Sequence, residues 1–166
     1  MIPIKDEIAT REPPVVNYVL IAINVIVYLF MALAAPEIQE TIVAKYAMIP
    51  AHFADGVTLA DIMTIFTSMF MHAGLAHLGG NMLYLWIFGD NVEDRIGHFR
   101  YLMFYLVGGV VASLTHLATN WGSQLPTVGA SGAIAAVLGA YLVLFPASRI
   151  VTLIPLGRFA RLTTAP

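Results

Sequence analysis

The chain has 166 residues, of which 59% are hydrophobic and only 11% are Asp, Glu, Lys or Arg. A soluble globular domain carries about 25% charged residues, so this composition excludes an ordinary water-soluble protein and indicates that lipid is part of its solvent. The net charge of -2 excludes the basic surface that is typical of nucleic-acid binding. The absence of cysteine excludes disulfides and thiolate metal sites.

The first predicted element follows a short leader. Residues 1–14 carry both acidic and basic side chains and end in two prolines, so we expect them to form an N-terminal leader outside the membrane. The stretch Val15–Ala35 contains no charged residue and stops at Pro36. Because a spanning helix needs about 20 mostly apolar residues, this stretch predicts a transmembrane helix over about 16–35.

Three more spans are predicted by the remaining uncharged runs. Ile62–Gly89 holds a span at about 70–90, and the charged run Asp90–Arg100 ends it. Tyr101–Ser148 is too long for one span and breaks at a polar, turn-forming cluster after residue 119, which predicts spans at about 101–119 and 130–146. The predicted fold is therefore an all-α, polytopic transmembrane helix bundle.

The connections between the spans are also informative. The 36–60 connection is too polar to span and too apolar for a free tail, so we interpret it as a partly submerged interfacial segment. The last stretch, 150–166, is short, basic and interrupted by proline, and we expect it to be a juxtamembrane segment rather than a fifth span.

The basic residues predict the orientation of the spans. Seven of them fall on one side of the predicted membrane and one on the other: Lys5, Arg11, Arg95, Arg100, Arg149, Arg158 and Arg161 against Lys45. Basic residues near the ends of spans stay on the cytoplasmic side, so the N-terminus should be cytoplasmic. We expect a multi-pass integral protein, with the lipid bilayer as its surroundings, in a prokaryotic cell membrane.

Three polar residues stand out within the predicted spans. His77 and Asn81 lie four positions apart, on one face of the second span, and Ser131 begins the fourth span within the sequence GASG. The predicted topology places all three in the outer half of the membrane, within reach of one another. Polar groups inside a membrane are costly, so they are candidates for function.

These residue types are suited to acyl transfer at a serine. A serine hydroxyl needs a base to become a nucleophile, and the oxyanion that forms needs donors already aimed at it. His77, Asn81 and the backbone N–H of Ser131 could supply those donors, while Gly129 and Gly132 allow a tight turn around the serine. Each residue alone also has a structural interpretation. Small residues pack helices closely, and a histidine or asparagine can hydrogen-bond within a helix bundle.

The chain resembles the rhomboid intramembrane serine proteases. The run from His72 to Gly109 is similar to their second and third helices, and the run from Gly129 to Pro146, which begins GASG, is similar to their nucleophile helix. The segment YAMIPAHF resembles their long first loop. The order H-x-x-x-N, E-x-R and G-x-S-G is specific as a combination, whereas any one of these motifs alone would be weak.

The resemblance implies a role for each matching residue. Ser131 corresponds to the nucleophile, and His77 and Asn81 correspond to side chains of the oxyanion hole. Glu93 and Arg95 correspond to a structural pair at the cytoplasmic end of the second helix; from the residues alone we expect a solvated pair worth about 0–1 kcal/mol. His72 lies five positions before His77, off its helix face, and is given no catalytic role.

The resemblance also implies a larger assembly. Rhomboid proteases place their general base, a histidine, on a sixth helix, and they cleave single-span membrane proteins without a metal or cofactor. No histidine here matches that base, although His116 is not excluded by depth. We therefore expect residues 15–166 to be an incomplete rhomboid domain with four of six spans, inactive alone.

Two alternatives to a protease stay open. One is a catalytically inactive, rhomboid-like protein that binds membrane helices and passes them to partners. The other is a small channel or transporter subunit, against which the scarcity of charge in the third and fourth spans argues.

Overall fold

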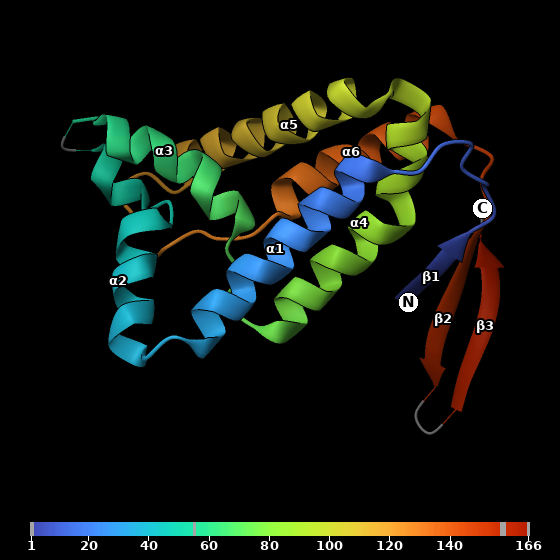
Figure 1. Cartoon of the computed structure of the whole chain (residues 1–166), viewed down its shortest axis with the longest axis horizontal. Helices are drawn as coiled ribbons and strands as arrows, with labels where there is room; N and C mark the ends of the chain where they lie inside the picture. Colours follow the sequence, from blue (N-terminus) through green and yellow to red (C-terminus); the bar gives the residue numbers. More distant parts are fainter. Residues whose placement is uncertain (1, 55, 157–158, 166) are drawn as a thin grey trace.

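The computed structural model describes residues 2–54, 56–156 and 159–165, without the side chains of 155–161, 164 and 165. Four long helices form the bundle (Figure 1): α1 Val15–Leu33, α4 Leu75–Ile96, α5 His98–Thr119 and α6 Ser131–Leu144. The beginnings of α1 and α5 and the ends of α4 and α6 share one end of the bundle. We call this the sheet end, because a small β-sheet lies beyond it, and the opposite end the serine end.

The connection after α1 is built of short helices at the serine end. It contains α2 Pro36–Tyr46, η1 Pro50–Phe53, α3 Leu59–Thr67 and η2 Ser68–Phe70. Thr58 and Asp61 form a reciprocal capping box at the start of α3, which satisfies backbone donors that a helix start leaves unpaired. The segment Leu59–Phe70 then meets α4 at an angle of 79°. The polypeptide therefore bends sharply just before His77.

The observed helices match the predicted spans only in part. Among the described residues, α1 and α5 are long and apolar enough to cross a membrane. The segment Leu59–Phe70 and α4 would together make a third span if the bent pair counts as one. α6 has 14 residues, fewer than the roughly 20 that a perpendicular crossing needs. The structure thus supports a membrane helix bundle with two or three spans of full length, rather than the four predicted.

The second predicted span differs most from its helix. The sequence predicts a span over about 70–90, but α4 begins at Leu75 and continues through the charged run to Ile96. Within that run, the Glu93 and Asp94 carboxylates accept hydrogen bonds from backbone N–H groups of the segment 11–17. Gly97, with a φ of 86°, then reverses the chain into α5; a left-handed φ of this kind favours glycine.

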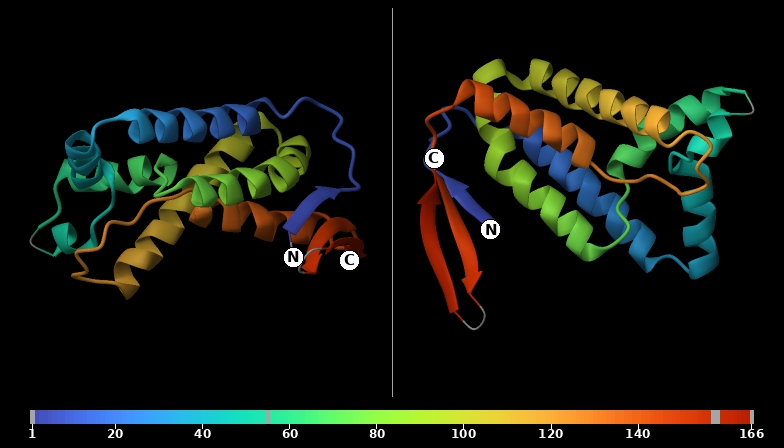
Figure 2. Two further views of the ribbon diagram at one scale, coloured as in Figure 1. Left: turned by 90° about the horizontal axis from the view of Figure 1, so that it is seen from below. Right: turned by 180° about the vertical axis from the view of Figure 1, so that it is seen from behind.

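The prediction of an all-α chain is wrong at both ends of the sequence. β1 Ile2–Asp6, β2 Ile150–Leu156 and β3 Phe159–Ala165 form an antiparallel sheet in the order β1-β2-β3. Asp6 pairs with Ile150, so the leader lies against the segment that follows α6. Figure 2 shows the sheet beyond one end of the bundle and α2 at the other. β-Branched residues in 150–154 favour a strand, but the sequence around them does not indicate that β1 is the partner strand.

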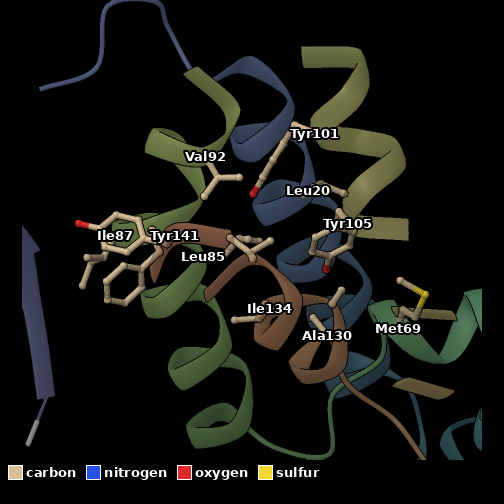
Figure 3. Packing of buried hydrophobic residues seen from close by; sticks show 13 residues of the cluster. Leu20, Met69, Leu85, Ile87, Val92, Tyr101, Tyr105, Ala130, Ile134 and Tyr141 are labelled. Atoms are coloured by element: carbon tan, nitrogen blue, oxygen red, sulfur yellow. The ribbon is translucent and has the colours of Figure 1, made fainter. Parts of the chain in front are cut away.

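The main hydrophobic core lies between α1, α4, α5 and α6. Figure 3 shows side chains from all four helices converging, with Leu20, Leu85, Tyr105 and Ile134 among those labelled. Leu85, Tyr101, Tyr105 and Val137 have no exposed surface. A second, smaller cluster packs η1 and α3 against the end of α5. The core therefore holds one face of α6 against the bundle, and Ser131 lies at the start of this helix.

Candidate active site around Ser131

Ser131 is the first residue of α6 and is exposed. The first helical hydrogen bond runs from the Ile134 N–H to the Ala130 carbonyl, so the N–H groups of Ser131, Gly132 and Ala133 have no acceptor within α6. A helix start of this kind carries a partial positive charge and favours an anion. The position of Ser131 thus combines an accessible hydroxyl with unpaired backbone donors.

Gly129 brings the side chains of α4 next to the start of α6. A Cβ atom built on Gly129 would lie 2.8 Å from His77 Nε2 and 3.7 Å from Asn81 Nδ2. The φ of Gly129 is 125°, and its N–H donates to the Ser68 carbonyl at 2.9 Å. Only glycine suits both the left-handed φ and the contact with the His77 ring. Two residues span at most about 7 Å, so His77 and Asn81 lie close to Ser131.

Gly132 has a different function in the structure, namely helix packing. A Cβ on Gly132 would lie 2.4 Å from the Cβ of Ala112 on α5, and a Cβ on Gly108 would lie 2.6 Å from the Cβ of Ala136. α5 and α6 therefore approach each other through small residues on both helices, as membrane helices often do. The close-packing interpretation of GASG thus holds for Gly132, while Gly129 contacts the polar side chains.

Two cavities adjoin Ser131 and His77. One, of about 180 Å³, is lined by Ser131, Gly129, Met69, Ser113 and His116. The other, of about 390 Å³, is lined by His77 and again by His116, together with residues of the loop before α6. His116 therefore lines both cavities. Its predicted depth in the membrane had not excluded a position near Ser131. Its Nδ1 lies 3.4 Å from the Asn120 amide nitrogen.

His72 belongs to this site although the sequence analysis gave it no role. Its Nε2 lies 2.9 Å from Asn81 Nδ2, and its ring meets the His77 ring edge-on with centroids 5.0 Å apart. His72 is not on the same helix as His77, because α4 begins at Leu75, after the bend, so the spacing of the two residues on a helix does not apply. The Gly74 that precedes α4 was the only local signal of that break.

Glu93 is placed differently from the prediction of a solvated pair with Arg95. The Glu93 side chain is fully buried; its two oxygens accept hydrogen bonds from the backbone N–H groups of Val16 and Asn17, at 2.8 and 2.6 Å. His98 Nδ1 also contacts it. Arg95 is exposed and forms no ion pair with any residue that the structure describes. Glu93 therefore caps the start of α1 from α4, a role that a buried carboxylate fills well.

Comparisons with known proteins identify the family of the chain. The rhomboid domain family matches residues 59–165. Over 130 residues the chain is 33% identical to "Rhomboid protease GluP" of Bacillus subtilis (strain 168), which covers 78% of this chain and 24% of that protein. It is 31% identical over 133 residues to the human "Presenilin-associated rhomboid-like protein, mitochondrial", covering 79% of this chain and 33% of that protein.

A third relative is closer in length. "Putative rhomboid protease YdcA" of Bacillus subtilis (strain 168) is 30% identical over 135 residues, which cover 80% of this chain and 63% of that protein. The chain spans a quarter to a third of the length of the first two relatives. The family match extends over more than half of this sequence and includes α4, α5 and α6. The chain therefore belongs to the rhomboid family of integral membrane proteins.

Proposed function

We propose that this chain carries the nucleophile and the oxyanion-binding groups of an intramembrane serine endopeptidase. The observation that carries the proposal is the contact at Gly129, which places His77 and Asn81 of α4 beside the start of α6. The exposed hydroxyl of Ser131 and the unpaired N–H groups of the first turn of α6 supply the other parts that acyl transfer requires.

The proposed reaction proceeds through an acyl-enzyme. The Ser131 Oγ attacks the carbonyl carbon of a peptide bond as its proton passes to a base, and the carbonyl oxygen becomes an oxyanion. That oxyanion accepts hydrogen bonds from the Ser131 N–H, from Asn81 and from His77. The C–N bond then breaks, the amine leaves with the proton, and water hydrolyses the ester. The base proposed from the resemblance is a histidine on a further helix.

The proposed substrates are single-span membrane proteins cut within or near the bilayer. This proposal rests on family membership and on the placement of the three polar residues in one region of a membrane helix bundle. The bias of basic residues leads us to propose that the N-terminus and the sheet end are cytoplasmic, so that the serine end lies toward the outer side.

A serine-directed fluorophosphonate probe tests this proposal in the product of the complete gene. We expect labelling that is lost in Ser131→Ala and kept in Ser113→Ala, a matched control because Ser113 lines the same cavity. Cleavage of a single-span reporter in liposomes should show the same pattern. Labelling that survives Ser131→Ala would exclude Ser131 as nucleophile. Reporter binding without labelling or cleavage would instead favour the inactive helix-binding protein.

A further inference from the structure

The bend before α4 places His72 in a buried position against the candidate site. His72 is only 3% exposed, although it lies in the connection between η2 and α4. Its side chain lies beside the first two turns of α4, where Nε2 meets the Asn81 amide nitrogen at 2.9 Å. A buried histidine needs hydrogen-bond partners to offset the loss of water, and Asn81 is the partner that the structure provides.

The chemistry of the two groups dictates the direction of this hydrogen bond. An amide nitrogen can only donate, so the His72 Nε2 must accept and cannot carry a proton. The neutral imidazole then has its proton on Nδ1. Nδ1 is buried and has no hydrogen-bond partner among the described residues. A ring protonated on both nitrogens would face the Asn81 amide with a second donor, which would break the contact.

The hydrogen bond also determines which end of the Asn81 amide faces α6. An amide nitrogen has two hydrogens, and His72 accepts only one of them. With its nitrogen held by His72, Asn81 presents that same atom 3.7 Å from the position of a Cβ on Gly129, two residues before Ser131. Without His72, the amide could rotate and turn its carbonyl oxygen toward the oxyanion, where it would repel rather than bind.

We propose that His72 is a positioning residue that orients the Asn81 amide so that its second N–H points to the oxyanion. This inference rests on the proposed function. Removing one oxyanion donor lowers kcat by about 10²–10³-fold in other serine proteases. Because His72 acts only through the orientation of one donor, its loss should cost about tenfold to a hundredfold in kcat and leave KM nearly unchanged.

Conservative variants distinguish orientation from packing. His72→Gln places an acceptor oxygen near the position of Nε2 and should restore most of kcat. His72→Asn is too short to reach Asn81 and should behave like His72→Leu. His52→Leu is the matched control, because His52 is an exposed histidine in η1, and it should leave kcat unchanged. Equal losses in His72→Gln and His72→Leu would overturn the proposal.

A double-mutant cycle supplies the stricter test. If His72 acts through Asn81, His72→Leu should lower kcat by less than about twofold when Asn81→Ala is already present. If His72 has a merely structural role, the kcat losses of His72→Leu and Asn81→Ala should multiply in the double variant, and that result would overturn the proposal. Thermal unfolding of every variant, followed in the same liposomes, separates lost activity from lost folding.

An observation without catalysis separates this inference from the proposed function. In an NMR spectrum of the protein labelled with ¹⁵N-histidine, the resonances that disappear in His72→Gln belong to His72. Their chemical shifts should be those of a neutral ring protonated at Nδ1. Asn81→Ala should change those shifts. A ring protonated at Nε2, or on both nitrogens, would overturn the proposal even in an active protease. Loss of the proposed protease function, with the Nδ1 tautomer still seen, would leave the Asn81 orientation standing.

Discussion

The two ends of the bundle differ in what their polar groups contact. At the sheet end, buried polar groups hold helices together: Glu93 accepts from the start of α1, and Asn17 donates to the Leu85 carbonyl and accepts from Tyr101. At the serine end, the Ser131 hydroxyl and the first N–H groups of α6 adjoin cavities. Satisfied polar groups stabilise a fold, whereas unsatisfied ones beside a cavity are available to a ligand.

From this difference we predict that substitution of Glu93 lowers the free energy of unfolding and does not act on the chemistry at Ser131. Glu93→Ala removes a buried carboxylate that binds the N–H groups of Val16 and Asn17, and it should lower the free energy of unfolding by about 3–5 kcal/mol. Unfolding of the protein by denaturant in micelles measures this.

Arg95→Ala is the control for Glu93, because the two residues share the E-x-R motif but Arg95 is exposed. It should change the free energy of unfolding by no more than about 0.5 kcal/mol. Equal effects of the two substitutions would mean that they form a pair after all, and the contrast between the two ends would lose its main example.

Gly129 should link stability and chemistry at the serine end. Gly129→Ala places a Cβ against the His77 ring on a residue with a φ of 125°. The strain and the contact should together cost about 2–3 kcal/mol of unfolding free energy. Displacing His77 by about 1 Å should also slow probe labelling of Ser131 by about a hundredfold.

Gly122→Ala separates the two causes. Gly122 also has a left-handed φ, of 75°, but a Cβ there would meet nothing within 4 Å. Strain alone should cost about 1 kcal/mol there and leave labelling of Ser131 unchanged. If both substitutions slowed labelling equally, the contact between Gly129 and His77 would not matter to the site.

The smallest expected effect concerns Asp6 at the sheet end. Asp6 accepts from Asn91 and Tyr141, and burial raises the pKa of its carboxyl above the ordinary value of 3.8, against the opposing effect of the Tyr141 hydrogen bond. A raised folded pKa means that this contribution to stability is complete below about pH 3.8 and is lost as pH rises through the folded pKa. The thermal midpoint of the wild type, relative to Asp6→Asn, should therefore fall from pH 4 to pH 7.

Glu7→Gln is the matched control for Asp6, because Glu7 is adjacent in the chain and exposed. Its midpoint relative to the wild type should not follow the same pH dependence. A difference between wild type and Asp6→Asn that is constant from pH 4 to pH 7 would show that burial does not control the Asp6 carboxyl.

The sequence predicted what depends on local pattern and missed what depends on distant partners. Uncharged runs located α1, α5 and α6, because spans are defined by composition over about 20 residues. The i, i+4 spacing of His77 and Asn81 predicted their shared face. Family membership is confirmed by the match over residues 59–165, whereas the catalytic roles of Ser131, His77 and Asn81 stay predictions.

The missed features have two physical causes. The cap on α1 comes from Glu93, the partner of Asn81 comes from before a bend, and the strand beside β1 follows α6. No periodicity or local motif encodes partners as distant as Glu93 and Val16, 77 positions apart, whereas His72, nine positions from Asn81, was missed because the chain bends between them. A charged residue interpreted as solvated, such as Glu93, can be buried when a helix start elsewhere needs an acceptor.

The pairing of β1 with β2 has a consequence for the order of assembly. β1 is synthesised before α1, but its partner strand β2 follows α6. The pairing closes a loop that contains α1 to α6, which is entropically costly and slow, so we expect it to form after α6 has packed. Until then Asp6 has neither Tyr141 nor the neighbouring strand. The sheet thus joins the segment before α1 to the segment after α6, and its amides should become protected from exchange after those of α1 to α6.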